Sequence, residues 1–375
     1  MKKILTVVFI GILSMVLIAC GGNSSGGEGN GEETIVLKAG TNLPSNHMMM
    51  EFIMNPLMER IEEETDGRVK FEVYDSESLV RAGEELEALN SGTIDIAIPM
   101  YDVYDVSRFP FSEVALLPTL DSNINVNTKA MEIFTTNEEP LANGETFKET
   151  VYGKEGLIAW PFATGNSYTI GSVGEPIESL SDLTSMQIRV PSNIHEIFAN
   201  KLGASPVNIS INETFDAFNR GTLDGGFTIV SDWESYGFDE VFTYAVDGIN
   251  AGVWPSTIAM KEERFNSLPE DIQEIMEKAI SEVPYSTEAI EDTDALEGKI
   301  LESFYDNDGI YQDVNDLPSE VTDRIDEAVA ATWTTWIDNV SKKDDLTLEV
   351  ALRWRDAILE AGGELPDEVK ELKLD

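Results

Sequence analysis

The fold is decided by residues 186–226, which read MQIRVPSNIHEIFANKLGASPVNISINETFDAFNRGTLDGG. A short apolar strand that carries Arg189 is stopped by Pro191, and a helical run follows until Gly203. A second strand, a second helix and a Gly-x-x-Asp-Gly turn come next. This alternation is typical of a parallel α/β sheet, in which ligands bind beyond the carboxyl ends of the strands. The stretch therefore predicts an α/β fold with a ligand site near the strand of Arg189.

Arg189 has two interpretations. Its guanidinium offers a planar fork of donors that matches a carboxylate, which favours a role in binding an acid. Gln187 and Arg189 also share one face of the strand, opposite its apolar residues, so Arg189 could simply face solvent. The residues alone leave both interpretations open.

The order of the motifs resembles a known family. Ile-Arg-Val-Pro, Leu-Gly-Ala-x-Pro-Val, Glu-x-aromatic-x-Ala and Gly-x-x-Asp-Gly follow one another as in the extracytoplasmic solute-binding subunits of TRAP transporters, the DctP-like family. Gln187 stands where that family more often has lysine. Residues 39–79 and 85–98 fit the family as well, and the resemblance runs from about residue 35 to about residue 340. It implies a two-domain fold like that of periplasmic binding proteins, with Arg189 pairing with the ligand carboxylate in an interdomain cleft.

The resemblance also implies how the chain divides and what it does. The first α/β domain takes 33–164 and 252–288, the second takes 165–251 and 289–340, and 341–375 form a C-terminal helical extension. The implied function is a receptor that captures a small organic acid and docks on a two-part TRAP permease driven by an ion gradient. Such a receptor is not an enzyme and needs no cofactor.

Two family features are missing from this sequence. A second arginine often stands in a Gly-x-Arg segment, which here reads Gly-Asn-Ser at 165–167, and a Glu-Asn pair often follows Asp-Gly, where 226–228 read Gly-Phe-Thr. With one cation and one amide absent, the sequence favours a ligand with a single carboxylate among hydroxyl or apolar groups over a dicarboxylate. The natural replacements, whose alternative role is turn chemistry, are Asn166, Ser167, Tyr168 and Thr228.

Further candidates lie near predicted strand ends. Asn46 and His47, in the first strand-to-helix loop, could donate hydrogen bonds to ligand oxygen, and an ordinary loop role is the alternative. Several aromatic side chains could shape the cleft or belong to the core: Trp160, Phe227, Trp233 and Trp254, with Tyr101 and Tyr104 after the third strand.

The N-terminus predicts export and lipidation. Two lysines precede the uninterrupted apolar or small residues 4–19, which are too short a run for a membrane span and fit a signal peptide at 1–19. The small residue before Cys20 resembles a lipobox, and the Gly- and Ser-rich residues 20–32 read as a flexible tether. Two acyl chains on Cys20 would hold the protein at the extracytoplasmic face of the membrane. The alternative is a plain signal anchor that happens to end in cysteine.

Composition limits the partners. The sequence has 70 acidic and 25 basic residues, a net charge of −45, which argues against nucleic acid and anionic membranes as partners. The charge does not imply a cationic ligand, because at physiological salt the Debye length is about 8 Å and most surface carboxylates are screened from a cleft. Cys20 is the only cysteine, so no disulfide is expected.

Enzyme motifs are absent from the sequence. His195-Glu196 is not followed by a second histidine at zinc-binding spacing, and no P-loop, Rossmann fingerprint or nucleophile elbow occurs, so no metal site is predicted. Three rival functions remain open: a binding lipoprotein of an ABC importer, a secreted hydrolase with paired carboxylates, and an adhesive or sensory lipoprotein.

Overall fold

A computed structural model describes residues 34–374. The predicted signal peptide (1–19), the lipidation site at Cys20 and the tether (20–32) lie outside the described residues. None of the helices that the structure describes is long and apolar enough to cross a membrane.

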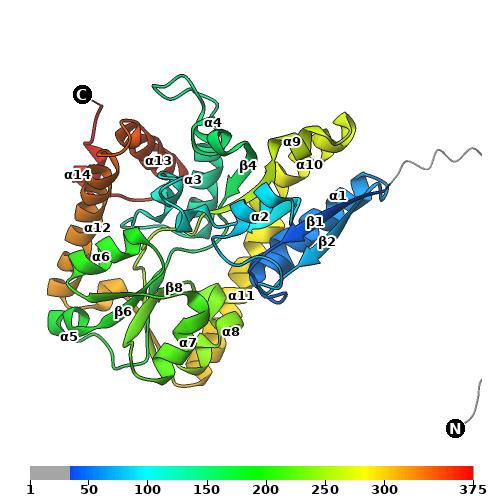
Figure 1. Ribbon diagram of the computed structural model, residues 1–375. Helices are drawn as coiled ribbons and strands as arrows, with labels where there is room; N and C mark the ends of the chain where they lie inside the picture. The colour runs from blue at the N-terminus through cyan, green and yellow to red at the C-terminus, as the bar shows by residue number, and fades with distance from the viewer. Residues whose placement is uncertain (1–33, 375) are drawn as a thin grey trace, which may run out of the picture. The chain divides into compact units, whose positions relative to one another are not determined.

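The first sheet has five strands in the order β2-β1-β3-β10-β4 (Figure 1). β1 pairs in parallel with β2 and β3, whereas β10 runs antiparallel to both β3 and β4. The carboxyl ends of β1 and β3 therefore lead into loops at the same edge, where parallel sheets place ligands. The strands are β1 (Ile35–Gly40), β2 (Val69–Tyr74), β3 (Ile96–Met100), β4 (Leu157–Phe162) and β10 (Ser256–Lys261).

The second sheet has six strands in the order β11-β9-β5-β8-β6-β7. β6 lies between β7 and β8 and is parallel to both, which confirms the strand and helix alternation predicted for 186–226. The fold class is thus the predicted one, mixed α/β with two sheets. The strands are β5 (Thr169–Ser172), β6 (Gln187–Val190), β7 (Ser205–Asn208), β8 (Gly225–Thr228), β9 (Tyr244–Asp247) and β11 (Ile310–Asp313).

Local sequence explains where the helices around β6 begin and end. Ser192 accepts a hydrogen bond from the backbone N–H of His195 and caps α6, which ends at the left-handed Gly203. Ser210 and Glu213 form a capping box at the start of α7. The helices are α1 (Asn55–Glu64), α2 (Glu85–Ser91), α3 (Ile124–Thr136), α4 (Phe147–Tyr152), α5 (Leu180–Ser185), α6 (Asn193–Leu202), α7 (Ile211–Asn219), α8 (Trp233–Tyr236), α9 (Glu262–Asn266), α10 (Glu270–Glu282), α11 (Thr287–Asp306), α12 (Ser319–Val340), α13 (Thr347–Ala361) and α14 (Asp367–Lys370).

The chain passes from one sheet to the other between β4 and β5, between β9 and β10, and through α11 between β10 and β11. Two of these crossings are bound together, because the backbone of Tyr168 exchanges hydrogen bonds with Ala251 and Gly252. Gly252 has a φ of 81°, and a Cβ there would lie 2.4 Å from backbone atoms of Leu116, so only glycine fits this close approach. The domain boundaries within these crossings stay a prediction.

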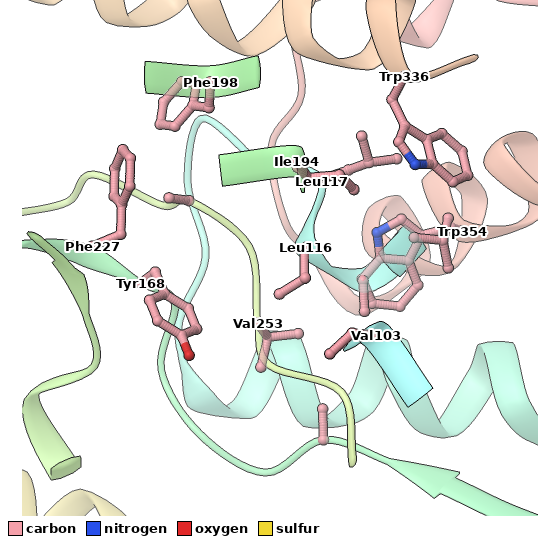
Figure 2. Close-up of a cluster of buried hydrophobic side chains, with 14 of the residues drawn as sticks. Val103, Leu116, Leu117, Tyr168, Ile194, Phe198, Phe227, Val253, Trp336 and Trp354 are labelled. Carbon is pink, nitrogen blue, oxygen red and sulfur yellow. The ribbon is translucent and has the colours of Figure 1, made fainter. Parts of the chain in front are cut away.

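Apolar packing joins elements of both sheets. Figure 2 shows Leu116 and Leu117 close to Ile194 of α6, with Phe227 of β8 in the same cluster. The C-terminal helices belong to this core: Trp336 of α12 and Trp354 of α13 are buried, and α13 packs on α3 while α12 packs on α6 (Figure 1). The region predicted as an extension is therefore part of the folded core.

Candidate functional site

A small pocket lies where loops of the two sheets meet. Its volume is about 60 Å³, and it is lined by residues that follow β1 and β3 of the first sheet and β6 and β8 of the second. Since one water needs roughly 10–15 Å³ on this scale, the pocket has room for a few waters or one small organic molecule.

Arg189 lines the pocket from β6. The residue is 2% exposed, so the solvent-facing interpretation is wrong. Its Nε donates to the carbonyl of Ile209 at 3.3 Å and a terminal nitrogen donates to the carbonyl of Phe227 at 3.2 Å. Within the described residues it forms no ion pair with a carboxylate. A buried cation without an anion is costly, so its remaining donors point to an anionic ligand.

The absence of a side chain at Gly226 of β8 leaves room for Arg189. Gly226 pairs with Arg189 across the parallel strands, and a Cβ at Gly226 would lie 3.2 Å from the Cβ of Arg189. Gly226, the residue after the predicted Gly-x-x-Asp-Gly turn, therefore lets β8 run close beside the arginine.

His195 lies close enough to feel the charge of Arg189. Burial first, and then the positive charge of Arg189, lower the pKa of His195 to about 3, so the imidazole is neutral. Its Nδ1 lies 2.8 Å from the Ser192 hydroxyl at the start of α6. The only positive charge in this part of the pocket wall, among the residues that the structure describes, is that of Arg189.

His47 and Asp232 join the two sheets at the pocket. Nε2 of His47, in the loop after β1, lies 3.1 Å from Oδ1 of Asp232, which follows β8. The backbone N–H of Met49 donates to Nδ1 of His47 at 3.2 Å, so this nitrogen carries a lone pair and the ring proton sits on Nε2. His47 is therefore placed to donate to Asp232.

Five aromatic residues belong to the remaining wall: Tyr101, Tyr104, Tyr168, Tyr236 and Trp254. Trp254 packs against Tyr101, Tyr104 and Tyr168 with ring centroids 5.6–5.9 Å apart, and Tyr236 packs edge-on against His47. Burial is the largest cause that raises the pKa of Tyr101, Tyr168 and Tyr236, so these three phenols stay protonated at neutral pH. The pocket thus offers flat apolar surfaces and hydroxyl donors around one guanidinium.

A second, larger hollow of about 880 Å³ has the opposite character. Asn166 and Ser167 line this hollow and not the pocket of Arg189. Burial raises the pKa of Glu297 to about 7, although Asn166 donates a hydrogen bond of 2.6 Å to its Oε2. No group of metal-ligating side chains in residues 34–374 is arranged to hold a metal ion. The carboxylates that line the hollow are those of Asp121, Asp247, Asp294, Glu297, Asp313, Asp326 and Glu364.

The structure brings four of the residues proposed from sequence to the pocket: Arg189, His47, Tyr101 and Tyr168. Tyr104 and Trp254, which the sequence left between cleft and core, also line it. Tyr168 lies between Phe227 and Val253 in Figure 2, so its ring is held by the core.

The other candidates lie elsewhere. Trp233 is fully buried and donates to the hydroxyl of Thr228 at 3.0 Å, so both serve the core of the second sheet. Phe227 is fully buried as well and reaches the site only through its carbonyl. Trp160 packs edge-on against Phe265, and Asn46 is exposed outside the pocket. These residues, like Asn166 and Ser167, do not line the pocket of Arg189 and are therefore not part of the candidate site.

Sequence reasoning missed several pocket residues. Ser231 and Asp232 lie three and four residues after the carboxyl end of β8, where parallel strands place ligand-binding loops, and this position is a signal that could have identified them. Tyr236 follows one helical turn later and had no such signal. Asn42 and Thr164 lie in irregular segments whose course depends on tertiary contacts.

Comparisons with known proteins agree with this geometry. The family model described as bacterial extracellular solute-binding protein, family 7 (DctP), matches residues 39–339. A solute-binding protein of Albidiferax ferrireducens is 24% identical over 221 residues, which are 58% of this chain and 61% of that protein. The C4-dicarboxylate-binding periplasmic protein DctP of Rhodobacter capsulatus is 27% identical over 230 residues, 60% of this chain and 64% of that protein. The alignments thus span somewhat less than two thirds of these relatives.

Among solved structures, a marine metagenome TRAP solute-binding protein described as specific for aromatic acid ligands, in complex with 3-hydroxybenzoate, superposes with a TM-score of 0.75. It is 18% identical in sequence, and the match covers 88% of this chain and 99% of that one. At this identity the likeness concerns the fold.

Proposed function

Since the chain belongs to the DctP family of bacterial extracellular solute-binding proteins, we propose that it is a lipid-anchored receptor that binds a small monocarboxylate and delivers it to a TRAP-type, ion-coupled membrane permease. The family consists of binding proteins, so the chain is a solute-binding protein and not an enzyme. One observation carries the proposed ligand class: Arg189 is buried, lines the pocket and has no carboxylate partner among the described residues.

The rest of the pocket favours one carboxylate on a flat, apolar body. A dicarboxylate would need a second cation, and the described lining offers none besides Arg189. The five rings of Tyr101, Tyr104, Tyr168, Tyr236 and Trp254 offer stacking and edge contacts to an aromatic acid. The aromatic acid bound by the similar marine protein supports this choice.

Binding is coupled to closure in this proposal. The pocket wall comes from loops of both sheets, and a ligand that touches both stabilises the arrangement in which they meet. The contact between His47 and Asp232 then holds the same two loops together beside the ligand. The closed receptor is the form that docks on the permease.

A thermal-shift screen tests the ligand class. Benzoate, phenylacetate, lactate and succinate are compared with benzamide, the neutral analogue of benzoate. A ligand present at 100 times its Kd stabilises the folded state by about 2.7 kcal/mol, which raises the melting temperature by several degrees. We expect benzoate and phenylacetate to give the largest shifts and benzamide none. Equal shifts with benzoate and benzamide, or no shift with any acid, would contradict the proposal.

A separate experiment tests the anchor. Cys20→Ser should move the protein from the membrane fraction to the soluble fraction, because the acyl chains have no other attachment point. Ser25→Ala, in the same tether, is the matched control and should leave the protein in the membrane fraction. Membrane retention of the Cys20→Ser variant would refute lipidation at this residue while leaving the ligand class untouched.

A further inference from the structure

The pocket holds two charged side chains of opposite sign. Among the described residues that line it, Arg189 is the only lysine or arginine and Asp232 is the only aspartate or glutamate. A ligand that brings a single carboxylate satisfies Arg189 and leaves Asp232 with no ligand group to pair with.

Asp232 is only partly satisfied by the protein. Its side chain is 12% exposed, and Oδ1 accepts the Nε2 proton of His47. The hydrogen bonds of the described chain include no donor to Oδ2, and this oxygen is not among the buried polar atoms that water cannot reach. Oδ2 is therefore accessible, and because Asp232 lines the pocket this oxygen is free to accept a hydrogen bond from a ligand.

Two phenols lie within electrostatic range of both charges. After burial, which is the largest cause, Asp232 raises and Arg189 lowers the pKa of Tyr168 and Tyr236. A ligand that contacts these rings therefore lies within range of both the guanidinium and the carboxylate.

Resting on the proposed function, we infer that the acid carries a hydrogen-bond donor away from its carboxylate, and that Asp232 is the residue that accepts it. The donor is a hydroxyl or an ammonium group, and both share the chemistry that a carboxylate oxygen recognises. An acid without this donor displaces water from the carboxylate of Asp232 and forms no hydrogen bond in its place. Buried polar groups left unpaired are what make a site reject such analogues.

The first test uses the unaltered protein and titration calorimetry. Benzoate sets the affinity due to carboxylate and ring, and 3- and 4-hydroxybenzoate add a hydroxyl at two positions. The matching methoxybenzoates occupy similar space but cannot donate, and 3- and 4-(aminomethyl)benzoate form the ammonium arm. Since a hydrogen bond to a charged group is among the stronger ones, we expect at least one donor-bearing acid to bind about tenfold tighter than benzoate.

The outcomes separate the two proposals. A donor-bearing acid that binds tighter than both benzoate and its methoxy counterpart supports the inference, and the better arm identifies the donor. If benzoate binds and no donor improves on it, the inference is overturned and the proposed function stands. If no acid in the set binds, the proposed function itself fails.

A variant assigns the effect to Asp232. In Asp232→Asn the amide oxygen can keep the hydrogen bond from His47, while the amide nitrogen presents a donor to the pocket. We expect the preference for a hydroxyl over a methoxy group, measured as a ratio of affinities within the variant, to shrink at least about fivefold, because the acceptor is lost. Glu234→Gln, an exposed position on α8, removes one charge nearby and is the matched control. An unchanged preference in Asp232→Asn would overturn the assignment.

Discussion

The two cavities are lined in part by the same segments of chain and differ in charge. Within residues 164–169, three residues line the pocket of Arg189, namely Thr164, Gly165 and Tyr168. The other three, Asn166, Ser167 and Thr169, line the acidic hollow. The pocket has one buried cation without an ion-paired carboxylate, and the hollow has seven carboxylates with no lysine or arginine in its described lining. Net charge therefore does not predict the charges that line a cavity: a chain of charge −45 buries one arginine in its pocket, and no carboxylate of the described residues forms an ion pair with it.

The proposed function places acid binding in the pocket of Arg189 and not in the hollow. Arg189→Ala is the strongest test of this proposal. Losing two charge-assisted hydrogen bonds should weaken binding of the best acid from the screen at least about 100-fold. The variant should still fold, because its alanine removes a buried charge and not a paired one. Calorimetry with the acid and a thermal melt without it measure both effects.

Two further variants sharpen this result. Arg189→Lys keeps the charge without the planar fork and should bind with intermediate affinity. Arg220→Ala removes an exposed arginine from the end of α7 and should bind like the unaltered protein. Full affinity in Arg189→Ala would show that the acid is held somewhere else, with the polar residues of the hollow as the next place to look.

Glu297→Gln tests the hollow. The folded-state pKa of Glu297 is raised by burial from 4.5 to about 7, so this carboxyl contributes most stability below pH 4.5 and loses it as pH rises through 7. Glutamine does not titrate and so has no such loss. Between pH 4.5 and pH 8 the free energy of unfolding of the variant should therefore rise by about 2–3 kcal/mol relative to that of the unaltered protein. Urea melts at both pH values measure the difference.

The same variant should bind the acid with unchanged affinity, because Glu297 does not line the pocket. Asp294→Asn, at an exposed position on α11, distinguishes the loss of one negative charge from the loss of the buried carboxyl. A stability difference that is the same at both pH values would contradict the account of Glu297.

Sequence reasoning predicted the fold better than the site, for a physical reason. The strands and helices of 186–226 follow from local pattern, caps and glycines, and the structure confirms them. The residues that line a site depend on the direction in which each side chain leaves its loop, and the tertiary contacts of the loop decide that direction. Ser167 and Tyr168 are neighbours in the sequence, yet they line different cavities because the backbone of Tyr168 is bound to 251–252.

Trp160 and Trp254 illustrate the same limit. The sequence placed both tryptophans near predicted strand ends, and no local signal separates them. Trp160 lies in the middle of the pairing between β4 and β10 and packs on Phe265, whereas Trp254 precedes β10 in the crossing segment and reaches the pocket. Arg189 could be predicted because an isolated arginine in an apolar strand is unusual, and Asp232 was missed because aspartate after a strand is common.

Trp254→Ala tests the aromatic wall of the pocket. Removing the ring at the centre of the contacts with Tyr101, Tyr104 and Tyr168 should weaken benzoate binding about tenfold, since ring contacts add to the buried apolar area. Lactate, which has no ring, should lose less. Trp160→Phe is the matched control, because it should lower the melting temperature without changing the affinity for benzoate. If Trp160→Phe weakens binding as much as Trp254→Ala, the division between core and pocket tryptophans is wrong.

Added salt should affect the exposed charges and leave the buried Arg189 almost unaffected. The expected change is smaller than those predicted for the variants at Arg189, Glu297 and Trp254. Raising sodium chloride from 0.05 to 0.5 M shortens the Debye length from about 14 Å to about 4 Å and screens repulsion among surface carboxylates. The melting temperature of the ligand-free protein should therefore rise by a few degrees, since a net charge of −45 destabilises the compact state. Acid affinity should change much less, because Arg189 is 2% exposed and its contact with the ligand is shielded from ions. Potassium chloride at matched ionic strength is the control for a specific ion effect. A melting temperature that stays flat while affinity falls steeply would reverse the assignment of exposed and buried charge.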